Sequence, residues 1–161
     1  MSDFEQMIRE CGEGWVIDWG GPGAPDIPFL QNLLKKVATA YGERVGGTAP
    51  AISEDVLVRL HKSNPVKAKA FVQALGATQN PDMLVMTWRI LMGMSIAKVS
   101  MDYTLSSHFS LGVVLESPYG ELEEYHSDNI DDAALLRHFG IMKMDAKPLF
   151  DGFYPLNVKG A

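Results

Sequence analysis

Three side chains in this chain have the chemistry of acid–base catalysis. Asp18 stands among bulky apolar residues in the segment 15–19, and a carboxylate in such surroundings can have a raised pKa. The ordinary alternative is an outward-facing acid on an edge segment. His126 and Asp131 follow in an acidic segment much later in the chain. A small enzyme would need at least two of these groups at one pocket, so Asp18, His126 and Asp131 are the catalytic candidates of an alternative hypothesis.

The pair Glu124 and His126 has donor types that suit a divalent metal ion. Alternate residues of a strand point to the same face, so these two side chains could converge while Glu123 points away. Their spacing matches no known metal loop, and we expect no cofactor. Cys11 could act as a nucleophile only if the fold brought a histidine to it, and no flanking sequence marks such a pair. A small structural thiol is the alternative for Cys11.

The acidic segment 116–132 is the most distinctive feature of the charge pattern. It contains seven carboxylates and no lysine or arginine, in a chain with a net charge of −6. Such a segment favours a basic protein surface and repels phosphate backbones. The alternative is a solvated face that only improves solubility.

A β-hairpin is predicted to position this segment. Phe109, Leu111, Val113 and Leu115 alternate with Ser110, Gly112 and Val114, which indicates a half-buried strand. Ser117-Pro118-Tyr119-Gly120 then has the composition of a turn. The returning strand would place either Leu122 or Tyr125 inward, and its exposed edge could accept an added strand from a partner. The expected binding residues are Glu121, Glu123, Glu124, Tyr119, Tyr125 and Asp128.

A long apolar segment precedes the hairpin and is predicted to be a central helix over about 81–101. Asn80-Pro81-Asp82 is a favourable helix start, and apolar residues cover most of the circumference that follows. Two internal cations, Arg89 and Lys98, argue for burial in a folded protein instead of a membrane. Together with nine methionines, this much apolar surface predicts a homo-oligomer or an obligate partner.

The N-terminal part is predicted to be mainly helical. Amphipathic or capped segments indicate helices over 2–10, 26–45, 53–63 and 65–76, and alternation over 15–19 indicates a short strand. The Gly/Pro-rich loop 20–25 lacks the lysine and hydroxyl of a phosphate-binding loop. The basic cluster over 59–69 indicates DNA only weakly, because its second helix offers two point charges, Lys67 and Lys69, on a mostly apolar surface. Nucleic acid is therefore not expected.

The C-terminal part is predicted to be a small mixed unit. A helix over 130–139 ending at Gly140 and a strand over 141–144 complete the order strand, strand, helix, strand that a β-grasp-like unit needs. The aromatic tail over 148–156 is expected to be packed. The predicted fold class is therefore α+β, a single compact domain over 1–161 with a mainly helical part, 1–104, and a mixed part, 105–161.

These patterns favour a non-catalytic protein-binding module or accessory subunit that uses the acidic hairpin. The alternative is a small enzyme or metal-binding protein with a pocket between the helical and mixed parts. A single cysteine and an N-terminus without a signal-peptide pattern predict a cytoplasmic protein with no membrane association.

Overall fold

The computed structural model describes residues 2–18, 26–45, 54–103 and 109–142. They form helices, a short 3₁₀-helix and a three-stranded antiparallel sheet, which confirms the predicted α+β class. The elements in chain order are α1 (Asp3–Asp18), α2 (Ile27–Val45), α3 (Glu54–Ser63), α4 (Pro65–Gly76), α5 (Pro81–Leu91), β1 (Ser95–Tyr103), β2 (Phe109–Glu116), β3 (Leu122–Ser127), η1 (Ile130–Ala134) and α6 (Leu135–Met142).

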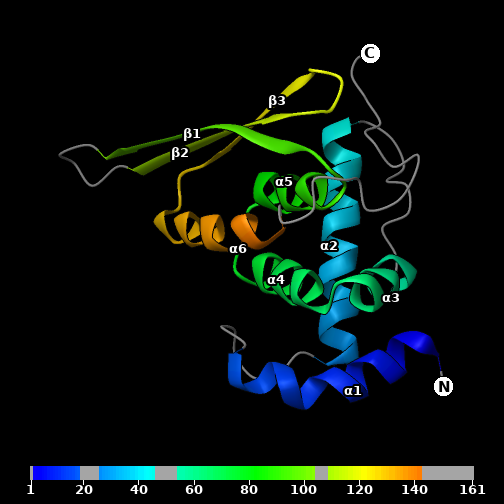
Figure 1. The fold of residues 1–161 in the computed structure, drawn as a ribbon. Helices are drawn as coiled ribbons and strands as arrows, with labels where there is room; N and C mark the ends of the chain where they lie inside the picture. Colours follow the sequence, from blue (N-terminus) through cyan, green and yellow to red (C-terminus); the bar gives the residue numbers. More distant parts are fainter. Residues whose placement is uncertain (1, 19–25, 46–53, 104–108, 143–161) are drawn as a thin grey trace.

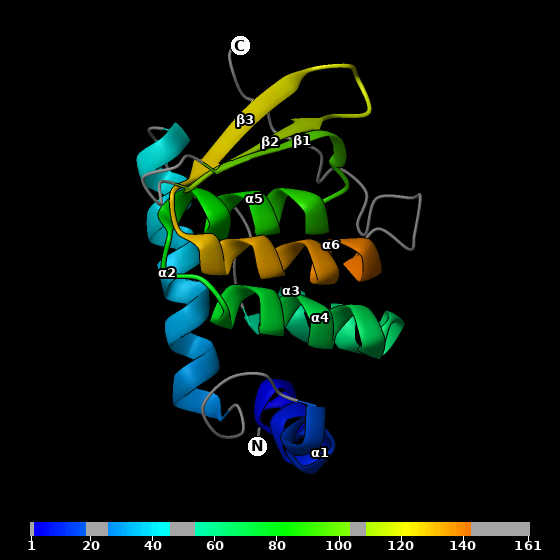
Figure 2. The same ribbon diagram turned by 90° about the vertical axis from the view of Figure 1, so that its left-hand side faces the viewer.

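The elements are stacked in layers, with the sheet at one end and α1 at the other (Figures 1 and 2). Helices α5 and α6 lie beneath the sheet, and α3 and α4 form the next layer. The long helix α2 runs along one side of the stack and reaches the sheet end (Figure 2). The C-terminal end of α2 is thereby brought to strand β3, where it contributes to the site described below.

Side-chain caps set the start of several helices, including the predicted start at Asn80. Ser2 and Glu5 form a reciprocal capping box, with N–H to oxygen distances of 3.1 Å in both directions. Asn80 accepts hydrogen bonds from the backbone N–H of Asp82 at 2.8 Å and of Met83 at 3.3 Å. Pro81 occupies the first position of α5, where its missing N–H costs nothing. The start of α5 is therefore fixed by local chemistry.

The end of α5 differs from the prediction, because the helix stops at Leu91 and the predicted helix over 81–101 is wrong in its second half. Gly93 has a φ of +112°, which only glycine adopts without strain. The N–H groups of Gly93 and Met94 then donate to the carbonyls of Ile90 and Arg89, both at 3.1 Å. This is the pattern of a Schellman C-cap. Residues after it become the edge strand β1.

Two predicted strands, over 15–19 and 141–144, are wrong in the residues that the structure describes. Helix α1 continues to Asp18, so the segment 15–18 is helical, and an isolated short strand there would have had no partner. Helix α6 continues to Met142, so Gly140 does not end it and residues 141–142 are helical. The Gly/Pro-rich loop 20–25, the remainder of the predicted strand 141–144 and the tail 148–156 lie outside the described residues. The described residues do not confirm the β-grasp comparison.

The hairpin is confirmed, with β2 between β1 and β3. Its turn is closed by a hydrogen bond from the Gly120 N–H to the Ser117 carbonyl at 3.0 Å, and Gly120 has a φ of +86°. Alternate β2 residues face the helices and are buried: Phe109, Leu111, Val113 and Leu115. This face packs with the apolar side of α5, including Trp88 and Ile90, to form the core beneath the sheet.

None of the helices in the described part of the chain is both long and apolar enough to cross a lipid bilayer.

Candidate functional site

Strand β3 divides its side chains between two faces of the sheet. Tyr125 and Ser127 are buried on the helix side, Glu123 is partly buried there, and the side chains that alternate with them, Leu122, Glu124 and His126, are exposed. The pairing of Val113 with Tyr125 and of Val114 with Glu124 fixes this register. Of the two registers that the sequence left open, the structure has the one that places Tyr125 inward.

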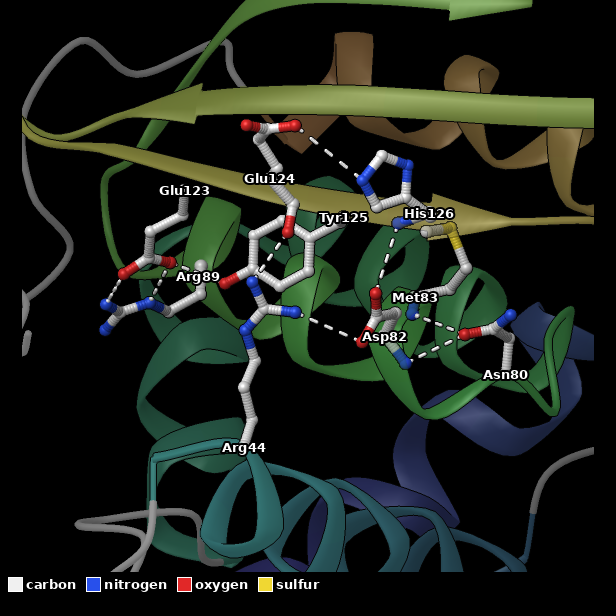
Figure 3. Close-up of polar contacts among 9 residues, drawn as sticks. All are labelled: Arg44, Asn80, Asp82, Met83, Arg89, Glu123, Glu124, Tyr125 and His126. Carbon is white, nitrogen blue, oxygen red and sulfur yellow. Dashed lines mark hydrogen bonds and ion pairs between the residues drawn. The ribbon is translucent and has the colours of Figure 1, made fainter.

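A buried arginine anchors the inner face of β3 to α5. The Nε of Arg89 donates to Oε1 of Glu123 at 2.9 Å, and its Nη2 makes a second, shorter contact with Oε2 (Figure 3). The Tyr125 hydroxyl also donates to Glu123, and the third nitrogen of Arg89 donates to the Tyr41 hydroxyl of α2 at 3.1 Å. The Arg89 side chain is 3% exposed and that of Glu123 15%. A two-pronged pair in such surroundings holds the strand and helix in one geometry.

The pKa values of this cluster follow from burial and pairing. Burial alone would raise the pKa of Glu123, but hydrogen bonds from Arg89 and Tyr125 outweigh it and the pKa is lowered. Burial alone would lower the pKa of Arg89, and the Glu123 carboxylate reverses this and raises it. Burial and the neighbouring carboxylate raise the pKa of Tyr125. Burial also raises the pKa of Tyr41. Glu123 is thus held ionised, and Tyr125 and Tyr41 stay neutral.

Glu123 and Tyr125 are therefore anchors of the sheet, which corrects the expectation that both belong to an exposed binding surface. Tyr125 is 0% exposed, so its ring offers no contact area to a partner. Asp132, a further acid of the segment 116–132, is 1% exposed and accepts a hydrogen bond from the Ser127 hydroxyl at 2.6 Å. Part of the acidic segment is consequently structural.

A second arginine covers the outer edge of β3. Arg44, near the end of α2, donates to the backbone carbonyl of Glu124 at 2.6 Å and to Oδ1 of Asp82 at 3.1 Å. The other oxygen of Asp82 accepts from the backbone N–H of His126 at 3.1 Å. The guanidinium also lies 3.8 Å from the centre of the Tyr125 ring. The Arg44–Asp82 pair thus presents one donor and one acceptor to the strand, as a neighbouring strand would.

This contact corrects the expectation that a partner strand adds to the β3 edge. The carbonyl of Glu124 and the N–H of His126 are already occupied by side chains of α2 and α5 (Figure 3). A strand could pair there only by displacing an ion pair. At these two positions the edge of β3 is occupied, whereas Leu122, Glu124 and His126 have exposed side chains.

We define the acidic face as the exposed acids and large apolar side chains of the hairpin, the loop that follows it and the start of η1. Three large apolar side chains among them are 75%, 62% and 52% exposed, namely Tyr119, Leu122 and Ile130. Five exposed carboxylates accompany them: Glu116, Glu121, Glu124, Asp128 and Asp131. Four of the six predicted binding residues, Tyr119, Glu121, Glu124 and Asp128, belong to this set.

The metal candidates Glu124 and His126 do lie on the same side of β3, with Oε1 and Nε2 3.7 Å apart. The imidazole lies over Gly112, where a Cβ added to the glycine would be 3.6 Å from Nδ1. Within the described ranges, no group of three or more His, Cys, Asp or Glu side chains gathers in a geometry that could hold a metal ion. The pair is best described as an exposed ion pair when the imidazole is protonated.

The structure does not bring the three catalytic candidates together. Asp18 ends α1, at the far end of the stack from the sheet that carries His126 (Figures 1 and 2). Asp131 is exposed in η1, where its N–H donates to the Asn129 side chain. A hollow of about 180 Å³ between α1 and α3 and another of about 450 Å³ beside α2 and the start of α5 are lined by other residues. Neither of these two hollows is lined by Asp18, His126 or Asp131.

Sequence reasoning missed Arg44 and Arg89 as the organising residues of the site. Arg89 did give a signal, because a lone cation in an apolar helix needs a buried anion as its partner. Arg44 gave none, since it lies 80 residues from Glu124 in the chain on a helix with several other exposed charges.

The fold and the site define the class of this protein as an α+β protein with a helix-backed, three-stranded antiparallel sheet. No protein-family model, no curated protein and no solved structure matched the chain. Its function is therefore inferred below from geometry and charge.

Proposed function

We propose that this chain is a non-catalytic protein-binding module, or the accessory subunit of a larger assembly, that recognises a basic protein surface with its acidic face. The observation that carries the proposal is the exposure of Tyr119 and Leu122, at 75% and 62%, among exposed carboxylates on an ordered hairpin. We also propose a cytoplasmic location, which the single cysteine supports.

The composition of the acidic face suits an interface. Aromatic and large aliphatic side chains supply most of the binding energy of protein interfaces, and charges around them steer the encounter and select the partner. Tyr119 and Leu122 would supply the apolar contact. Glu121 directly precedes Leu122 and Glu124 follows it two residues later, and both would meet lysine or arginine side chains. Charge alone would lack the apolar contact, and apolar area alone would not select a basic partner.

Rigid support from beneath strengthens the proposal. Arg89 fixes the inner side of β3 through Glu123, and Arg44 fixes its edge through the Glu124 carbonyl. A face that is ordered before binding loses less conformational entropy when the partner docks. Because the edge is occupied, we propose docking onto side chains instead of strand addition.

Charge reversal on the acidic face tests the proposal. Glu121→Lys combined with Glu124→Lys should leave the fold intact, because both side chains are exposed. Association with a basic partner should slow by about tenfold or more, since rim charges act mainly on the association rate. Affinity capture from cell extract with wild-type and variant chains, followed by association-rate measurements on the captured protein at about 50 and 500 mM salt, provides the readout.

The matched control is Glu10→Lys combined with Glu43→Lys, which makes the same change in net charge at exposed positions of α1 and α2. The proposal requires a protein that the wild type and this control bind equally and that the acidic-face variant loses. If the two double variants lose the same proteins to the same extent, only net charge matters and the acidic face is a solvated surface.

A further inference from the structure

The two edges of the sheet differ in how they are covered. At the β3 edge, Arg44 and Asp82 occupy backbone groups of the strand. Strand β1 forms the opposite edge, and within the described part of the chain no strand pairs with its outer side (Figure 1). An uncovered strand edge is a ready template for pairing with another chain.

The inner face of β1 is also apolar and exposed. Val99 pairs with Val113 and Met101 pairs with Leu111, so these side chains share one face of the sheet. The two β2 residues are 1% and 0% exposed, whereas Val99 is 38% and Met101 44% exposed. The helical layer thus covers this face at β2 but leaves it open at β1.

The sequence of β1 is complementary to itself in one antiparallel register. If two copies pair with Ser100 opposite Ser100, Lys98 of each copy stands opposite Asp102 of the other. In the same register Val99 stands opposite Met101 of the other copy. All four side chains are exposed in the single chain. The charge pairs fall on the outer face and the apolar pairs on the open inner face. Because a two-fold axis relates the two copies, each contact occurs twice.

We propose that a second copy of this chain docks on β1 in this register, around a two-fold axis at Ser100. The two three-stranded sheets then form one continuous antiparallel sheet of six strands. The register shift between Ile96 and Lys98 interrupts the regular ladder at that end and limits the pairing to about residues 98–102. The acidic faces of both copies, which lie toward β3, stay accessible.

The charge pattern is what selects a second copy over another occupant. A strand of another protein, or the chain's own apolar segment 148–156, would have no reason to match Lys98 and Asp102 at this spacing. Asp151 is the only charged residue of that segment, so the segment has no pair of opposite charges spaced as Lys98 and Asp102 are around Ser100. Cross-strand charge pairs and apolar pairs each contribute favourably, and like charges directly opposite are unfavourable. A pairing this short buries little area, so we expect dissociation constants of roughly 1–100 µM.

Charge exchange tests this register. Lys98→Asp places Asp opposite Asp twice, and Asp102→Lys places Lys opposite Lys twice, so each variant alone should be monomeric. Mixed in equal amounts, these two variants restore both opposite-charge pairs and should form a heterodimer. Sedimentation velocity from about 5 to 500 µM measures these states, with wild type dimerising as concentration rises. Lys35→Asp and Asp55→Lys make the same charge changes on exposed positions of α2 and α3 and should dimerise as wild type does.

A cross-link fixes the axis independently. In a Cys11→Ala background, Ser100→Cys should give a disulfide-linked dimer on mild oxidation, because the two residues face each other across the axis. Ser110→Cys, which lies on the same outer face but within the central strand β2, is the control and should not cross-link. A wild-type chain that stays monomeric to 500 µM overturns the proposal. A dimer that Lys98→Asp leaves unchanged also overturns it, because such a dimer would use another surface. That result would be expected if the segment 148–156 covered β1.

Discussion

Ile90→Asp is expected to abolish folding, whereas Met101→Asp leaves the chain folded. Ile90 is 2% exposed in α5 and packs within the core beneath the sheet. An unpaired carboxylate there costs several kcal/mol, which is a large part of the roughly 5–15 kcal/mol that stabilises a typical domain. Met101 is 44% exposed on an edge strand, so the same substitution should change the free energy of unfolding by about 1 kcal/mol or less.

Urea denaturation followed by circular dichroism separates the two outcomes. Ile90→Leu, which keeps the volume and polarity of the site, serves as the control and should unfold cooperatively near the wild-type midpoint. A continuous buried helix over 81–101 would instead make both aspartate substitutions equally destructive. Equal loss of structure in Ile90→Asp and Met101→Asp would therefore contradict the boundary at Gly93.

Removing Arg89 should produce the second large loss of stability. Arg89→Met leaves the Glu123 carboxylate partly buried without its main partner, and breaking a buried pair from one side typically costs about 3–5 kcal/mol. The double variant Arg89→Met with Glu123→Leu leaves no unpaired charge and should recover at least half of that loss. Chemical denaturation of wild type, both single variants and the double variant measures the coupling. Additive losses in the double variant would mean that the pair does not act as a unit.

The same pair predicts a dependence of stability on pH. The pKa of Glu123 is lowered below its ordinary value of 4.5, so the folded state binds this proton less readily than the unfolded state. The stabilisation is present above about pH 4.5 and is lost as the pH falls through the lower, folded-state value. The free energy of unfolding of Glu123→Gln should therefore depend less steeply on pH between about 5 and 2 than that of wild type. Identical slopes would show that the pair contributes no linkage.

Local chemistry explains which parts of the fold were predictable from the sequence. The caps at Ser2 and Asn80 and the turn at Gly120 act over four residues or fewer, so their side chains specify them directly. The end of α5 was also specified locally, by Gly93. The predicted helix ran past Gly93 because apolar residues continue into β1. They alternate along the strand, which has one face toward the core, and this spacing resembles the apolar periodicity of a helix.

The candidate site depended on contacts that no local pattern announces. Arg44 and Glu124 meet only because α2 runs along the whole stack and ends beside the sheet (Figure 2). The acidic segment 116–132 has one charge sign, yet Glu123 and Asp132 turn inward and the other acids turn outward. Strand period places Glu123 and Glu124 on opposite faces, but which face is buried depends on the helices that cover it.

The most direct test of the proposed acidic face is an amide chemical-shift map. The ¹⁵N-labelled chain would be titrated with the protein that the wild type captures and the Glu121→Lys/Glu124→Lys variant loses. The proposal predicts that the largest shifts occur from Tyr119 to Asp131, with small shifts in α1 and α3. Shifts concentrated instead around Lys35 and Lys36, beside the hollow at α2, would contradict recognition by the acidic face.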